Sequence, residues 1–217
     1  MIFEYGEKET QYLKKKDKRL GEAIEIIGPI ERATYPDLFS AVIYTIVGQQ
    51  ISAAAVKTVW SRLCTMLGAI TAETIDNSSE ALLQSAGITF KKAGYMKNFT
   101  SQVLSGRFDI EGLHLKSDAE VISEISSLSG LGVWSAEMLM LFAMQRPDIL
   151  SYGDLAIHRG LRMLYHHKNV DKNLFEKYRK RYSPYASVAS LYLWAISANA
   201  IPEMKEYAPA KNKEAVK

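Results

Sequence analysis

The sequence predicts an all-α protein, because apolar residues recur at a helical period, strand-like alternation is scarce, and turn residues divide the chain at short intervals. The chain has 217 residues, of which 47% are hydrophobic, so it can bury one large core or two smaller ones. That composition also excludes a chain that is disordered throughout. Helix start and stop signals predict about eight to ten helices with short connections.

The first clear apolar stripe lies within Phe39–Val47, where side chains repeat at i, i+3, i+4 and i+7 and therefore share one helical face. The stripe follows Tyr35, Pro36 and Asp37. Proline suits the first turn of a helix, and a carboxylate there complements the helix dipole. The pattern predicts a helix that is entered through Pro36 and Asp37.

Two further stripes lie in the second half of the chain. Ala136–Ala143 is stopped by Arg146-Pro147, and Val188–Ala195 is entered through Ser183-Pro184. Clusters of glycine, proline, asparagine and aspartate mark further turns, at Gly28-Pro29, Asp76–Ser79, Gly87, Gly106, Gly130–Gly132 and Gly153-Asp154.

Charge and composition limit the classes of protein that the chain can belong to. A net charge of +3 permits a nucleic-acid partner without requiring one. The apolar stretches are shorter than the roughly 20 residues of a membrane span, so we expect no membrane insertion. Charged residues from Glu4 to Glu9 interrupt any apolar signal sequence, and we expect a cytoplasmic protein, on the nucleoid of a bacterium or in the nucleus of a eukaryote. The single cysteine, Cys64, excludes an internal disulfide and a cysteine-rich metal site.

Two segments are strongly charged, the basic run Lys14–Arg19 and the tail Lys205–Lys217. Such segments are usually a solvated helix face or a frayed terminus. We expect that structural role for both of them in preference to a binding role.

A glycine hairpin is the first feature that points to chemistry. Gly130 and Gly132 separate a helical segment, 119–126, from a helix that begins near Val133. Glycine permits a tight turn whose backbone N–H groups point outward at the start of a helix, where they can bind an anion such as phosphate. By itself the pattern also fits a simple turn between two helices.

Asp154 follows Trp134 by twenty residues and stands directly before a predicted helix. It can act as an N-cap, because its carboxylate accepts hydrogen bonds from the first free backbone N–H groups. It can also be a functional carboxylate held at the mouth of a cleft. The residues alone leave both roles open.

The hairpin, the spacing to Asp154 and the segment Val47–Ser52 (Val-Gly-Gln-Gln-Ile-Ser) together resemble the helix-hairpin-helix DNA glycosylases (HhH-GPD superfamily), most closely the 3-methyladenine DNA glycosylase II branch. The resemblance covers about residues 35–199. It implies an all-α fold of two subdomains with the active-site cleft between them. Residues 36–145 would form the central subdomain, with the motif at about 119–144, and residues 1–35 plus 146–217 would form the subdomain that carries the catalytic aspartate.

The resemblance implies a monofunctional enzyme that flips alkylated purines of the 3-methyladenine type out of duplex DNA and hydrolyses the N-glycosidic bond, the first step of base excision repair. Asp154 would be the catalytic residue. The partner would be double-stranded DNA with damaged bases, and the protein would act as a monomer. No cofactor would be required, although Na⁺ or K⁺ could be held at the hairpin by the main-chain carbonyls of Ser126, Leu128 and Leu131.

The resemblance also implies a wedge at Gln50, which would fill the gap that the flipped base leaves, with Gln49 beside it. Alternatively, the two glutamines only solvate a helix end. Basic residues near the motifs are candidates for phosphate contacts, namely Lys91, Lys92, Lys97, Arg159 and Arg162. The expected DNA-binding residues are Gln49, Gln50, Ser52, Gly130, Leu131, Gly132, Val133, Ser135 and Arg159.

Aromatic faces attract a cationic base, and Trp134 and Trp194 match pocket tryptophans of this branch. Met138 and Leu155 stand where the branch has tyrosines, which leaves the range of substrates open. Bifunctional relatives place a lysine at the position of Trp134, and that lysine attacks the sugar as an amine. An indole lacks this reactivity, so the resemblance implies no strand-cleaving lyase activity.

Two other classes of function remain open. A non-catalytic helix-hairpin-helix DNA-binding protein would keep the glycines but would not need Asp154 or an aromatic pocket. A glycosylase for oxidised or mismatched bases would favour hydrogen-bonding groups in its pocket.

Overall fold

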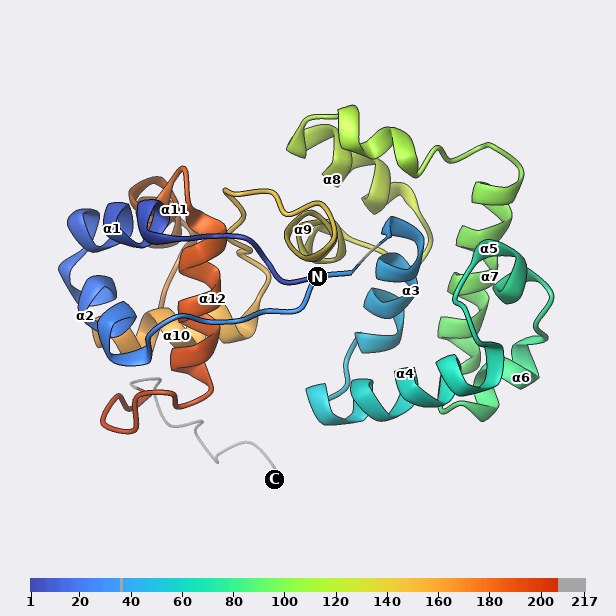
Figure 1. Ribbon diagram of the computed structural model, residues 1–217, viewed down its shortest axis with the longest axis horizontal. Helices are drawn as coiled ribbons and strands as arrows, with labels where there is room; N and C mark the ends of the chain where they lie inside the picture. Colours follow the sequence, from blue (N-terminus) through green and yellow to red (C-terminus); the bar gives the residue numbers. More distant parts are fainter. Residues whose placement is uncertain (36, 207–217) are drawn as a thin grey trace, which may run out of the picture. The chain divides into compact units, whose positions relative to one another are not determined.

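The computed structural model describes residues 1–35 and 37–206. In this part of the chain it contains twelve α-helices, one short 3-10 helix and no β-sheet, so the predicted all-α class is confirmed (Figure 1). None of the described helices combines the length and apolar character that crossing a bilayer demands.

The chain divides into two compact units. Unit 1 consists of Met1 and Ala33–Gln145, and unit 2 consists of Ile2–Arg32 and the chain from Arg146 onward. Two segments that are far apart in the chain, one near its start and one covering its last third, therefore contribute to one unit.

Unit 1 is built around α3 (Leu38–Gly48), whose side chains are buried on nearly every side and which packs against α4, α7 and α9. Phe39 of α3 stacks on Phe99 of α7 with ring centroids 5.2 Å apart. The other elements of unit 1 are α4 (Ala53–Leu67), α5 (Ala72–Asp76), α6 (Glu80–Ser85), α7 (Phe90–Leu104), the 3-10 helix η1 (Glu111–Leu115), α8 (Asp118–Ser127) and α9 (Val133–Phe142).

Unit 2 is built around α12 (Ala186–Ser197), which packs against the four other helices of the unit. These are α1 (Glu7–Lys16), α2 (Lys18–Ile27), α10 (Leu155–Tyr165) and α11 (Lys172–Tyr182). The backbones of α10 and α12 approach closely at Gly160, where an added Cβ would lie 2.3 Å from the carbonyl oxygen of Leu193. A side chain at position 160 would therefore force the two helices apart.

The structure confirms the predicted helix entry at Asp37. Helix α3 begins at Leu38, and Asp37 is its N-cap, with Oδ1 accepting a hydrogen bond from the backbone N–H of Ser40 at 2.7 Å. The carboxylate acts through this capping bond, directly at the helix start, as well as through the dipole. The expectation for Pro36 lies outside the described residues.

More helices form than the eight to ten expected, because capping side chains start short ones. Thr71 caps the five-residue helix α5, and Ser79 caps the six-residue helix α6. Both helices are shorter than two turns, so the sequence cannot show the helical repeat of apolar residues in them.

The basic run Lys14–Arg19 spans the junction of two helices. Asp17 ends α1 and caps α2, and its Oδ2 accepts a hydrogen bond from Arg181 at 2.5 Å while the aspartate side chain is only 3% exposed. Lys15, Lys16 and Lys18 are exposed, in agreement with a solvated surface. The prediction for the C-terminal tail falls, from residue 207 onward, outside the described residues.

Candidate functional site

The glycine hairpin lies between α8 and α9, as the sequence predicts. Gly130 has φ +81°, and a Cβ there would lie 2.1 Å from the ring of Tyr95. Both the positive φ and the close ring require glycine. Leu128 and Leu131 anchor the turn from inside, with 3% and 7% of their surface exposed.

The N-terminus of α9 is open to an anion. Its N-cap, Gly132, supplies no side-chain hydrogen bond, and the space that a Cβ would occupy there has no atom within 4 Å. Val133 is 53% exposed, whereas Ser135 is buried. Leu131 and Ser135 can therefore reach a phosphate only through their backbone, and the exposed turn at Gly130, Gly132 and Val133 offers the accessible N–H groups.

The Gln-Gln segment lies against this hairpin. Gln49 is the C-cap of α3, and its side-chain Nε2 donates to the carbonyl of Gly130 at 2.7 Å. Gln50 is exposed and has φ +57°, the left-handed region that few residues other than glycine adopt. Ser52 caps α4 by accepting a hydrogen bond from Ala55 N–H at 3.3 Å. The structure thus joins two predicted DNA-binding segments within unit 1.

Two of the lysines considered for phosphate contacts bind main-chain carbonyls. Lys92 Nζ donates to Val47 O at 2.8 Å and to Gln49 O at 2.6 Å. Lys97 Nζ donates to Ile75 O and Ser78 O, as well as to Asp76 O, at the C-terminal end of α5. Both ammonium groups therefore cap helix C-termini, where a positive charge is favourable.

The hairpin offers oxygen ligands for a monovalent cation. Such ions bind carbonyl oxygens, and the predicted ligands are the main-chain carbonyls of Ser126, Leu128 and Leu131, of which Leu128 O accepts a hydrogen bond from Leu131 N–H at 3.1 Å. Ser126 Oγ is buried and has no hydrogen-bond partner among the described residues, a polar atom that an ion or its hydration water would satisfy. The donor set fits a hard cation. In the described chain no group of three or more histidine, cysteine or acidic side chains is placed to hold a transition metal.

Asp154 is the N-cap of α10 and is only 9% exposed. Its Oδ1 accepts hydrogen bonds from Ala156 N–H and Ile157 N–H, each at 2.9 Å, and from the indole Nε1–H of Trp194 at 3.2 Å. Asp154 therefore caps α10. It also accepts a hydrogen bond from Trp194 of α12, a contact that capping alone does not require. Together these donors hold the carboxylate in one orientation.

Trp194 is half-buried, and the guanidinium of Arg32 lies 6.0 Å from the centre of its ring. Arg32 is a contact that sequence reasoning missed, since 162 residues of sequence separate the two positions and no local pattern connects them. The indole therefore combines a polar edge that bonds Asp154 with a ring face that attracts a cation.

The other candidate residues are divided between the units. Trp134 and Met138 belong to α9 in unit 1, where Trp134 is half-buried and Met138 is 7% exposed. Leu155 belongs to unit 2 and is 84% exposed. Arg159 pairs with Glu206, its Nε lying 3.1 Å from Oε2, and Arg162 pairs with the same carboxylate.

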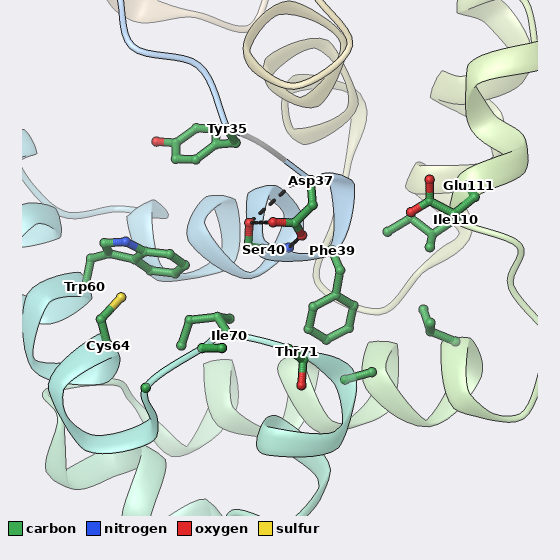
Figure 2. A pocket seen from close by; sticks show the side chains of 14 residues that line it. Tyr35, Asp37, Phe39, Ser40, Trp60, Cys64, Ile70, Thr71, Ile110 and Glu111 are labelled. Atoms are coloured by element: carbon green, nitrogen blue, oxygen red, sulfur yellow. Dashed lines mark hydrogen bonds between the residues drawn. The ribbon is translucent and has the colours of Figure 1, made fainter. Parts of the chain in front are cut away.

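A cavity of about 580 Å³ in unit 1 is a separate feature. Figure 2 shows Tyr35, Trp60 and Cys64 on its wall, with Asp37 bonded to Ser40 through the backbone N–H and, at 2.6 Å, through the hydroxyl. That carboxylate is already engaged as the cap of α3. None of the residues predicted for DNA binding or catalysis lines the cavity.

Known proteins are similar to this chain over the same segments. Residues 43–184 match the family described as the HhH-GPD superfamily base excision DNA repair protein. The matched range includes the Gln-Gln segment, the hairpin and Asp154.

Several relatives resemble most of the chain. A DNA-3-methyladenine glycosidase of Bacillus halodurans is 31% identical, with 95% of this chain and 97% of that chain covered at a TM-score of 0.80. The 3-methyladenine DNA glycosylase of Schizosaccharomyces pombe, solved with abasic DNA, is 23% identical, with 88% and 97% covered at a TM-score of 0.79. A DNA-3-methyladenine glycosylase of Saccharomyces cerevisiae is 25% identical over 76% of this chain and 68% of its own length.

Proposed function

The chain belongs to the HhH-GPD superfamily of base excision DNA repair proteins, and we propose that it is a monofunctional glycosylase for alkylated purines in duplex DNA. The observation that carries this proposal is the buried Asp154 carboxylate, held by two backbone N–H groups and the Trp194 indole. The 3-methyladenine glycosylases among its relatives support the same substrate class. The protein would act as a monomer in the compartment that holds the DNA, the bacterial nucleoid or the eukaryotic nucleus.

DNA would be gripped in unit 1. The open N–H groups at Gly132 and Val133 suit a backbone phosphate, because the start of α9 carries partial positive charge. Na⁺ or K⁺ on the carbonyls of Ser126, Leu128 and Leu131 would add positive charge beside that phosphate. No cofactor is needed for the chemistry that follows.

Base release would depend on Asp154. An alkylated purine carries positive charge and leaves as a neutral base, so protonation of the leaving group matters less than stabilisation of the cationic sugar. A carboxylate with 9% exposure acts in a site with little water, where its field is strong. Asp154 would stabilise the oxocarbenium-like transition state and orient the attacking water.

The ring face of Trp194 would attract the positively charged base in unit 2, and Trp134 is the aromatic candidate of unit 1. The guanidinium of Arg32 lies over one face of the Trp194 ring, so a cationic base would have to replace that guanidinium or bind the opposite face. A neutral oxidised base would gain less from such a face and would need more hydrogen-bonding groups.

The experiment that tests the substrate class compares three duplexes of one sequence, containing 3-methyladenine, 8-oxoguanine or a mismatch. We expect release of the methylated base at least about a hundredfold faster than release of the other two. Faster release of 8-oxoguanine or the mismatched base would assign the alternative glycosylase class. Tight duplex binding with no base released from any substrate would identify a non-catalytic binding protein.

Gln50 would fill the gap left by the flipped base. Gln50 is exposed and lies just beyond the C-terminal end of α3, in a left-handed backbone conformation. Gln50→Ala is expected to weaken binding to damaged duplex by about tenfold more than binding to the same single strand, which has no stack to fill. Gln84→Ala, at an exposed glutamine of α6 in the same unit, is the matched control. Equal losses on duplex and single strand would refute the wedge role.

A further inference from the structure

Lys92 connects helix α7 to the C-terminal end of α3. Its ammonium donates to the carbonyls of Val47 and Gln49 at 2.8 and 2.6 Å, and the side chain is half-buried. Those contacts use two of the three ammonium protons. Burial lowers the pKa of Lys92, because the charged form loses hydration there.

The contact with Gln49 bears on the neighbouring residue. The carbonyl oxygen of Gln49 belongs to the peptide group that also contains the nitrogen of Gln50, and that group is planar. A hydrogen bond to this oxygen therefore fixes the peptide plane from which the φ angle of Gln50 is measured. Gln50 has φ +57°, a conformation that a glutamine keeps only when its surroundings hold it.

The same loop is tied to the hairpin from the other side. Gln49 Nε2 donates to Gly130 O at 2.7 Å, and the ring of Tyr95 occupies the space that a Cβ at Gly130 would need. Tyr95 follows Lys92 by three residues on α7, so both side chains lie on one face of that helix. One helical face thus supports the Gln-Gln segment through Lys92 and the hairpin through Tyr95.

We propose that Lys92 is a positioning residue that holds Gln50 ready to enter the DNA stack, rather than a residue that contacts phosphate. This role rests on the proposed function, because it concerns how the same DNA-binding site positions Gln50. Lys92 acts through the carbonyl of Gln49. Its hydrogen bonds order the Gln-Gln segment in the free protein, so DNA binding does not have to supply that ordering free energy. Loss of Lys92 would leave a loop that must be ordered during binding.

The chain contains a matched control. Lys97 lies on the same helix and also caps a helix C-terminus, by donating to the carbonyls of Ile75, Asp76 and Ser78. Lys97→Met removes one positive charge and one carbonyl cap, as Lys92→Met does, but at a place away from the Gln-Gln segment. Lys92→Gln, which keeps an uncharged N–H donor group, serves as a second variant if Lys92→Met fails to fold.

The test measures affinity for a duplex that contains a stable abasic-site analogue and for the same strand alone. Lys92→Met is expected to lower duplex affinity about tenfold more than single-strand affinity, Lys92→Gln by an intermediate factor, and Lys97→Met equally on both. In a Gln50→Ala background, Lys92→Met should cost less than about twofold on the duplex, because the residue that it positions is gone.

Salt dependence separates positioning from direct phosphate contact. A lost phosphate contact lowers the slope of log affinity against log salt by about 0.9, whereas a lost positioning residue leaves the slope unchanged. A lower slope, equal losses on both DNA forms, or a full loss in the Gln50→Ala background would overturn the proposal. Wild-type protein without preference for abasic over undamaged duplex would contradict the proposed function itself, and the positioning role with it.

Discussion

Asp154→Asn is expected to lower base release from alkylated duplex DNA by about 10²- to 10³-fold while leaving DNA affinity within about twofold. Asparagine has the same shape and is an equally good N-cap, so the bonds from Ala156 and Ile157 can persist. The negative charge that stabilises the cationic sugar is lost. Single-turnover release of the methylated base, with binding measured in parallel, checks both parts.

A second capping aspartate provides the control for this variant. Asp171 caps α11 by accepting a hydrogen bond from Leu174 N–H at 2.8 Å, and it is exposed. Asp171→Asn should leave base release unchanged, and both variants should unfold at nearly the wild-type temperature. If Asp154→Asn retained base release but unfolded at a lower temperature, Asp154 would be an N-cap with no catalytic role.

The wild-type protein is expected to leave an intact abasic strand and to form no covalent adduct with DNA when borohydride is added. Lyase chemistry requires an amine that forms a Schiff base with the opened sugar. The resemblance to the helix-hairpin-helix glycosylases implies that Trp134 stands where bifunctional members carry that amine, and its indole nitrogen is neither basic nor nucleophilic. The half-buried ammonium of Lys92, whose pKa is lowered by burial, donates to Val47 O and Gln49 O and is thereby held at the C-terminal end of α3.

Trapping is measured on a gel that separates free protein from protein–DNA adducts, beside a glycosylase that has a catalytic lysine. Strand breaks should appear only after alkali or an added endonuclease. An efficient borohydride adduct of the wild-type protein, mapped to any lysine, would contradict the monofunctional assignment.

Local signals in the sequence predicted the helical class, the hairpin and the start of α9 near Val133, and the structure confirms each of them. The capping position of Asp154 was also predictable, because a cap depends on the next three residues only. Other predictions depended on distant partners. Lys92 was considered for phosphate, but its partners at Val47 and Gln49 are about 45 residues away and follow from the packing of α7 on α3.

The same reason applies in unit 2. The sequence of the basic run does not show that Asp17 is buried and bound to Arg181. The two residues are 164 positions apart, so no local pattern connects them. The bond from Trp194 to Asp154 was equally hidden, because it forms only when α12 packs on α10. The sequence predicts a site role for each residue, but their contact depends on tertiary packing that a local pattern does not encode.

The measurement that tests the central claim most directly counts products from one reaction. Wild-type protein is incubated with methylated duplex DNA, without added cofactor and with a chelator present, and free methylated base and abasic sites are quantified together. We predict that free 3-methyladenine accumulates over many turnovers, in equal amount to abasic sites on unbroken strands. Methylated base that stays in the DNA after prolonged incubation, with the protein folded and bound, would contradict the proposed function.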